Sequence, residues 1–256
     1  MKYAIIAAGE GSRLAHEGVQ MPKPLVTIHG ETLLQRLIRI FMDNQAEEIC
    51  VICNGQTESV AQHLEEIMHK GLGGIPVPLK MLVKTTPSSM HSLYELSRFF
   101  DDDVFCATTV DTLFREREFA EYIFMLDKAV RNGEADGLMG VTSYIDDEKP
   151  LYVNTADDLS VTGFYDEPMP GVRYVSAGIY GLHRRAIDTL KACVARGEMR
   201  MRNFQRALLT VGLSLKAFPF SKVIDIDHAS DIVKAETFLD RQVDDKQSQT
   251  VNSSND

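Results

Sequence analysis

The sequence lacks the long apolar runs, the basic blocks and the paired cysteines that mark several classes of protein. No stretch approaches about 18 apolar residues, so no membrane-spanning helix is expected. Lys and Arg number 27 against 37 Asp and Glu, a formal net charge of −10. An acidic chain without a Lys/Arg block binds nucleic acid and anionic membranes poorly. An anionic substrate would therefore need a few focused cations or a metal ion.

Cysteine is scarce, and its close pair has the wrong geometry for a metal or redox site. Cys50 and Cys53 have C-x-x-C spacing, but residues 48–53 have the character of a buried strand. Side chains alternate faces along a strand, so positions three apart point in opposite directions. No second pair follows at zinc spacing. We therefore expect these two, with Cys106 and Cys193, to be reduced core thiols of a cytoplasmic protein, since the apolar run at 4–8 is also too short for a signal peptide.

Short apolar runs alternate with amphipathic stretches through the first 135 residues. This alternation predicts an α/β fold with a mixed, mainly parallel sheet flanked by helices. Hydrophobic spacing predicts strands over 2–8, 48–53, 78–84 and 103–110, and helices over 32–44, 57–70, 90–100 and 116–132. Beyond residue 136 the strand-like segments 136–144, 159–166 and 173–182 predict a β-rich insertion, a lid or a wall for a second substrate. Helices are expected again over 184–196, 202–211 and 229–243, and residues 244–256 as a polar tail.

A glycine-rich turn directly after the first strand is the most informative segment. Gly9, Gly11, Ser12 and Arg13 follow the apolar run. Glycines let the backbone turn tightly, so that successive N–H groups converge on an anion, and Arg13 adds forked donors suited to phosphate. A plain strand-to-helix turn is the alternative. The G-x-x-x-x-G-K-[ST] loop is absent, and the dinucleotide motif G-x-G-x-x-G is incomplete, because its third glycine position holds Leu14.

Two prolines flank a lysine ten residues beyond the turn. Each of Pro22 and Pro24 fixes its own φ and restricts the residue before it. We therefore expect Lys23 in a rigid, extended segment. A lysine held in this way can serve as a positioned phosphate ligand, and a surface-loop lysine is the alternative.

The combination of residues 7–14, residues 22–25 and Gly30 resembles the motif of the nucleotidyltransferase (NTP_transferase) family. That family includes the sugar-phosphate nucleotidyltransferases, or nucleoside-diphosphate-sugar pyrophosphorylases. The resemblance implies a Rossmann-like sheet of the glycosyltransferase-A type in one domain over 1–243, with a nucleotide-binding part (1–135) and an acceptor and metal part (136–228). It also implies that Arg13 and Lys23 act in catalysis on phosphates. The nucleotide-binding residues that it implies in the turn are Ala7, Ala8, Gly9, Gly11, Ser12 and Arg13.

Two acidic segments resemble the Mg²⁺ ligands of the family. Asp111 follows an apolar strand, at the end that faces the ligand crevice in open α/β sheets, although a lone Asp there is also a common turn residue. Asp225-Ile-Asp227-His-Ala-Ser-Asp231 resembles the Asp-x-Asp-Thr-Pro-Glu-Asp segment of the family. Matching residue by residue assigns Mg²⁺ to Asp111 and Asp227. Asp225 is the alternative ligand, because it lies two positions away along a strand and on the same face.

Weaker matches lie on the base and acceptor sides. Thr86 and Ser88 lie where the family reads the nucleobase, and a cap on the following helix is an equal alternative. Glu167 and Gly178 resemble the acceptor-binding pair. Sugar-specific members carry Glu-Lys-Pro where this chain has Asp-Glu-Pro at 166–168, so their lysine is absent.

The resemblance implies a Mg²⁺-dependent enzyme of nucleotide-sugar biosynthesis. It would transfer a nucleotidyl group from an NTP to a phosphorylated small molecule, typically a sugar 1-phosphate, and release pyrophosphate, with neither nucleic acid nor membrane as partner. One alternative is a cytidylyltransferase acting on phosphocholine or a phosphonate. Another is a non-catalytic nucleotide-binding module, which the joint presence of Arg13, Lys23, Asp111 and Asp227 disfavours. A third is a glycosyltransferase, whose Asp-x-Asp motif would follow a mid-chain strand, whereas residues 101–103 precede theirs.

Overall fold

The fold is described from a computed structural model, which covers residues 1–9 and 11–252. The strands are β1 Lys2–Ala7, β2 Thr27–Ile28, β3 Glu31–Thr32, β4 Glu48–Cys53, β5 Leu79–Val83, β6 Val104–Thr109, β7 Thr112–Leu113, β8 Gly137–Thr142, β9 Tyr152–Thr155, β10 Val161–Tyr165, β11 Tyr174–His183, β12 Leu215–Phe220 and β13 Ile224–Asp225. The α-helices are α1 Ser12–His16, α2 Leu33–Asp43, α3 Glu58–Lys70, α4 Ser89–Leu96, α5 Glu116–Arg131, α6 Ala186–Ala195, α7 Met201–Thr210 and α8 Ala229–Asn252. Short 3₁₀ turns occur at Lys23–Leu25 and Ser97–Phe99.

Four parallel strands form the half of the sheet nearest the N-terminus, in the order β5-β4-β1-β6. The register aligns Ala7 with Cys53 and Ile6 with Thr109, so β1, β4 and β6 end together. Nearly every residue of these three strands is buried, as expected for strands covered by helices on both faces. Their shared carboxyl edge is where ligands bind in open α/β sheets.

The β-rich part expected after residue 136 continues this same sheet. β11 runs antiparallel to β6 and also pairs with β8 and β9, while β12 runs parallel to β8. The strands expected over 136–144, 159–166 and 173–182 are present as β8, β10 and β11, and β9 and β12 are additional. Direct pairing of β11 with β6 places the second half of the chain beside the carboxyl edge of the first half.

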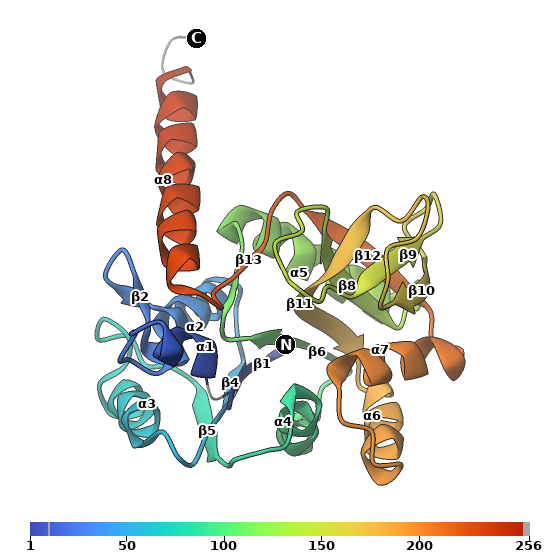
Figure 1. Ribbon diagram of the computed structural model, residues 1–256, viewed down its shortest axis with the longest axis horizontal. Coiled ribbons are helices and arrows are strands. Elements are labelled where there is room, and N and C mark those ends of the chain that lie inside the picture. The colour runs from blue at the N-terminus through green and yellow to red at the C-terminus, as the bar shows by residue number, and fades with distance from the viewer. Residues whose placement is uncertain (10, 253–256) are drawn as a thin grey trace.

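Helices cover both faces of the sheet (Figure 1). Apolar side chains of α2, α3, α5 and α8 form one buried cluster with one face of the strands, and those of α4, α6 and α7 form a second cluster with the other face. Cys50 and Cys53 belong to different clusters, and both are buried free thiols. The expectation that the C-x-x-C side chains point in opposite directions is therefore confirmed.

The ends of the helices follow local signals, with one exception. Thr32 caps α2 in a reciprocal arrangement with Gln35, and Gly71 follows α3 as expected. The last helix, in contrast, continues from Ala229 to Asn252, so most of the expected polar tail at 244–256 is helical, and residues 253–256 lie outside the described residues. Neither Gly nor Pro occurs between 229 and 252 to end the helix. No helix in the described part of the chain is long and apolar enough to cross a membrane.

Candidate active site

The glycine-rich turn leaves β1 at the shared carboxyl edge of the sheet. Ala7 and Ala8 are buried there, and Gly9 and Gly11 follow before α1. Gly11 has a φ of 61°, and a Cβ on it would lie 3.2 Å from the Cβ of Lys23. Glycine adopts this left-handed conformation without strain. The absent side chain therefore lets the two halves of the family-like motif pack against each other.

Lys23 begins a 3₁₀ turn, so the expectation of an extended segment is wrong. The N–H of Leu25 donates to the Pro22 carbonyl at 2.8 Å and closes the turn. Pro24 fits because a residue in the first turn of a helix has no partner for its N–H in any case. The turn orients Lys23 inward, where its side chain is only 11% exposed.

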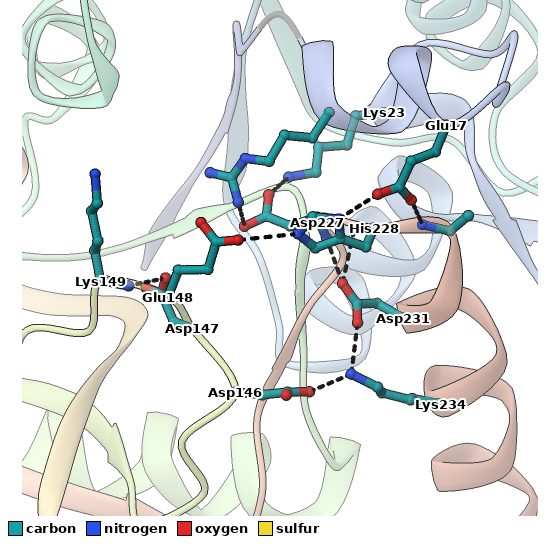
Figure 2. Close-up of polar contacts among 12 residues, drawn as sticks. Glu17, Lys23, Asp146, Asp147, Glu148, Lys149, Asp227, His228, Asp231 and Lys234 are labelled. Atoms are coloured by element: carbon teal, nitrogen blue, oxygen red, sulfur yellow. Dashed lines mark hydrogen bonds and ion pairs between the residues drawn. The ribbon is translucent and has the colours of Figure 1, made fainter.

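The Lys23 ammonium bridges two carboxylates from distant parts of the chain. Its Nζ lies 2.5 Å from Oδ2 of Asp111 and 2.7 Å from Oδ1 of Asp227. Arg13, which follows Ser12 in α1, lies 2.9 Å from Oδ2 of Asp227. Figure 2 shows Lys23 directed at the carboxylate of Asp227. The two expected catalytic cations and the two expected metal ligands therefore form one cluster.

Mutual attraction keeps Lys23 and Asp111 charged. Burial by itself lowers the pKa of Lys23, but the charges and hydrogen bonds of Asp111 and Asp227 raise it above its ordinary value. Burial likewise raises the pKa of Asp111, but Lys23 and a hydrogen bond from Thr109 lower it below the ordinary range. Lys23 and Asp111 are therefore both ionised at neutral pH.

Asp225 lies beside these groups but in a different electrostatic state. β13 pairs with β7, aligning Asp225 with Thr112, and the N–H of Ile226 donates to the Asp111 carbonyl at 3.1 Å. Desolvation by the surrounding protein, followed by repulsion from Asp111 and Asp227, raises the pKa of Asp225 above its ordinary value, although the residue keeps an exposed surface. The Lys23 ammonium thus bridges Asp111 and Asp227, while Asp225 is repelled by both carboxylates.

The chemistry of this cluster suits Mg²⁺. That ion is usually held by one or two carboxylates, with water and substrate phosphates completing its shell. Asp111 and Asp227 supply two hard oxygen donors that already share one cation, the Lys23 ammonium. In residues 1–9 and 11–252, no group of three or more His, Cys, Asp or Glu side chains could hold a metal ion. Two carboxylates match the usual contribution of a protein to the shell of this ion, so Asp111 and Asp227 fit Mg²⁺.

The two hydroxyls expected at the nucleobase serve the N-terminus of α4. Ser88 Oγ accepts from the N–H of His91 at 3.4 Å and lies 2.9 Å from its Nδ1. Thr86 Oγ1 lies 2.6 Å from Ser92 Oγ. The capping alternative is therefore confirmed for Ser88, which also lines a cavity beside Asp111. Contact of either hydroxyl with a base stays a prediction.

Asn54 is a candidate residue that reasoning from the sequence missed. It is buried directly after β4, and its side chain donates to the Ala8 carbonyl at 3.4 Å. Its Oδ1 accepts from Thr85 Oγ1 at 2.7 Å and from the N–H of Gln56 at 3.0 Å. Asn54 thus links the loops that follow β1, β4 and β5. A polar residue directly after a buried strand was the signal that could have identified it.

The two expected acceptor residues differ in their surroundings. Gly178, on β11, lines a cavity that also contains Asp111 and Asp225. Glu167 is exposed and is not among the residues that line this cavity. Its neighbour Asp166 is held by two arginines of α7, Arg202 at 2.5 Å and Arg206 at 2.8 Å. The structure therefore brings Gly178, but not Glu167, to the carboxylate cluster.

The N-terminus of α8 joins the loops on both sides of the cluster (Figure 2). Glu17, after α1, lies 2.6 Å from Nδ1 of His228 and accepts from the N–H of Ala229 at 2.7 Å. Asp231 accepts from the N–H groups of Asp227 and His228 at 3.1 and 2.8 Å. These contacts fix the backbone on both sides of Asp227. Glu17 carried no sequence signal, because its partners are more than 200 residues away.

The fold and the site define a class of protein. A helix-covered α/β sheet carries at its carboxyl edge a glycine-rich turn, the inward ammonium of Lys23, the more exposed guanidinium of Arg13 and two carboxylates. This is the arrangement of a nucleotide-binding α/β protein that handles phosphates. Residues 2–242 match the nucleotidyl transferase family. The chain belongs to that family.

Comparison with known proteins gives distant relatives. The bifunctional protein GlmU of Methanococcus maripaludis is 22% identical over 247 residues, which are 94% of this chain and 55% of that protein. The chain thus spans about half the length of this relative. GlmU of Prochlorococcus marinus is 36% identical over only 66 residues, 26% of this chain and 14% of that protein.

Solved structures share the fold at low identity. A Bacillus anthracis protein assigned as a glucose-1-phosphate thymidylyltransferase has a TM-score of 0.78 and 18% identity, covering 93% of this chain and 94% of its own. The inositol-1-phosphate CTP transferase of T. maritima has a TM-score of 0.72 and 17% identity, covering 90% of each chain. The predicted family and the Rossmann-like fold of this family are confirmed. The Asp-x-Asp motif of a glycosyltransferase would follow a mid-chain strand. The acidic run at 101–103 instead lies before β6, and its Asp101 pairs with Lys2 at 2.6 Å.

Proposed function

We propose that this protein catalyses Mg²⁺-dependent transfer of a nucleotidyl group from an NTP to a phosphorylated small molecule. The observation that carries the proposal is the Lys23 ammonium, shared between Asp111 and Asp227 beside the glycine-rich turn. An acidic protein here gathers two cations and two carboxylates at the ligand edge of its sheet. That is the charge pattern needed to bind a polyphosphate together with a metal.

The reaction needs positioning and charge neutralisation more than covalent chemistry. An oxygen of the acceptor phosphate attacks the α-phosphorus in line, the new P–O bond forms, and the bond to the β-phosphate breaks with its electron pair leaving on pyrophosphate. Arg13 and Lys23 turn from the carboxylates to the phosphates and stabilise the leaving pyrophosphate. Mg²⁺, when held by Asp111 and Asp227, would supply neutralisation of the α-phosphate and the attacking oxygen.

The acceptor class follows in part from this chain's own residues. A sugar 1-phosphate is the acceptor that the family resemblance favours. Residue 167, however, is a glutamate outside the cavity, and Asp166 is occupied by Arg202 and Arg206. Phosphocholine and a phosphonate are therefore the second class of acceptor, because neither depends on the lysine that sugar-specific members carry there.

Pyrophosphate release tests the proposal. The protein with Mg²⁺ is assayed with ATP, CTP, GTP, UTP and dTTP against sugar 1-phosphates, phosphocholine and aminoethylphosphonate. We expect release to require one NTP and one acceptor, and to be lost in Asp111→Asn and in Asp227→Asn while far-UV circular dichroism stays unchanged. Full activity in both variants would show that the assignment of the metal ligands is wrong, and absence of NTP binding would overturn the whole proposal.

A further inference from the structure

A cavity of about 450 Å³ opens beside the carboxylate cluster. It is lined by Asp111, Asp225 and Gly178, together with Lys149 and with Arg200, which lies one residue before α7. A molecule bound in this cavity would contact Gly178 on β11, which is one of the two residues expected on the acceptor side. Its charge preference therefore bears on the second substrate.

Lys149 and Arg200 are unusual among the basic residues of this acidic protein. Most Lys and Arg side chains in the described ranges have an acidic partner, as Arg196 does with Glu198 at 2.8 Å. Within those ranges, neither the Lys149 ammonium nor the Arg200 guanidinium is paired with a carboxylate. Figure 2 shows the Lys149 side chain reaching away from Glu148 and His228. Two uncompensated positive charges thus line one cavity.

Neighbouring contacts fix the loop of Lys149 and pair several of the other charged groups around the cavity. Arg202 donates to the Lys149 carbonyl at 3.0 Å, so it ties the loop of Lys149 to the first turn of α7. Asp166 neutralises Arg202. Of the three acidic groups that line the cavity, Asp111 is bound by Lys23, Asp147 accepts from the N–H of Lys149 at 2.9 Å, and Asp225 lies next to Asp111. Lys149 and Arg200 are therefore the two basic side chains of this cavity that no carboxylate in the described ranges neutralises.

We propose that Lys149 and Arg200 bind the phosphate or phosphonate dianion of the acceptor. This inference rests on the proposed function and names the residues that place the acceptor. Two cations that line one cavity can hold a dianion with charge-assisted hydrogen bonds. A dianion held there lies in the same cavity as Asp111, so its oxygen is placed for attack on an α-phosphate at the metal carboxylates.

Chemical modification tests the site without knowledge of the acceptor. Phenylglyoxal modifies accessible arginines, and peptide mass spectrometry follows Arg200 and, as control, Arg173, which is exposed, unpaired among the described residues and outside the cavity. We expect inorganic phosphate to slow modification of Arg200 several-fold but not that of Arg173, and Lys149→Ala to weaken this protection. A mixture of NTPs with Mg²⁺ should leave Arg200 reactive. Equal reactivity with and without phosphate, protection unchanged in Lys149→Ala, or protection by NTP alone would overturn the inference.

Kinetics give a second readout once an acceptor turns over. Lys149→Ala and Arg200→Ala should each raise the KM for the acceptor about ten- to hundred-fold, as expected for loss of one charge-assisted contact, with the KM for the NTP unchanged. Arg200→Lys should recover part of the loss, and Arg173→Ala should behave as wild type. An unchanged acceptor KM would refute the role of the pair while the proposed function stands. Absence of turnover in the wild type would instead refute the proposed function, and the modification experiment would still decide on the anion site.

Discussion

Substitution of Gly178 by alanine should disable the site, because Gly178 packs against two threonine hydroxyls that position Asp111. Gly178 has a φ of 71°, and a Cβ there would lie 2.7 Å from Oγ1 of Thr112 and 3.0 Å from Oγ1 of Thr109. Those two hydroxyls are 2.6 Å apart, and Thr109 also hydrogen bonds to the Asp111 carboxylate. A methyl group at position 178 therefore pushes on the pair of hydroxyls that orients Asp111.

The magnitude follows from two separate effects. The left-handed conformation costs a residue with a Cβ about 1–2 kcal/mol, and loss of the Thr109–Thr112 hydrogen bond costs about 1 kcal/mol. Gly178→Ala should therefore lower the free energy of unfolding by about 2–3 kcal/mol. Displacement of Asp111 by a fraction of an ångström should lower kcat as well, by up to roughly 100-fold.

A matched control separates backbone strain from displacement of Asp111. Gly133, after α5, has a similar φ of 69°, but a Cβ there meets nothing within 4 Å. Gly133→Ala should thus lower the free energy of unfolding only by the cost of the strained backbone, and it should keep full activity. Urea unfolding measures the free energy of unfolding, and it is followed by far-UV circular dichroism because the chain has no Trp. Steady-state pyrophosphate release measures kcat. If Gly178→Ala lost no more stability than Gly133→Ala and kept the wild-type kcat, the reasoning would be refuted.

Three further predictions concern charge and burial. Lys23→Ala should lower kcat sharply yet tighten Mg²⁺ binding to the free protein, because its ammonium occupies the space between Asp111 and Asp227; weaker Mg²⁺ binding by calorimetry would contradict this. Burial raises the pKa of Asp231, but Lys234 and two backbone N–H groups lower it below the ordinary value, so its stabilisation is present above about pH 4 and is lost as pH falls through its folded-state pKa. Asp231→Asn should therefore cost about 1–2 kcal/mol at pH 7 and progressively less in urea titrations below pH 4. Burial raises the pKa of Cys50 to about 12 and of Cys53 to about 11, so a thiol reagent at pH 7.5 should react with them only after unfolding, and rapid reaction in the native protein would show that they are accessible.

Local patterns in the sequence predicted most of the long elements and few of the short ones. The helix expected over 32–44 is α2, because apolar spacing and the Thr32 cap are both encoded within a dozen residues. The two-residue strands β7 and β13 carry no such pattern, since each exists only through pairing with the other. The 3₁₀ turn at Lys23–Leu25 was missed because the flanking prolines suit an extended segment equally well.

The sequence by itself determined the family-like motif, the α/β alternation and the identity of the charged residues that carry the chemistry. The positions of glycine and proline, the apolar character of the strands and the position of Asp111 after one of them are local properties. They can be identified from the sequence without knowledge of the fold. The tertiary structure alone decided that Lys23 contacts Asp111, 88 residues away, and Asp227, 204 residues away. It also decided that Glu167 lies outside the cavity that Lys149 and Arg200 line. The physical reason is that such encounters depend on which strands pair and which loops pack at one sheet edge, and no local stretch of sequence encodes that pairing.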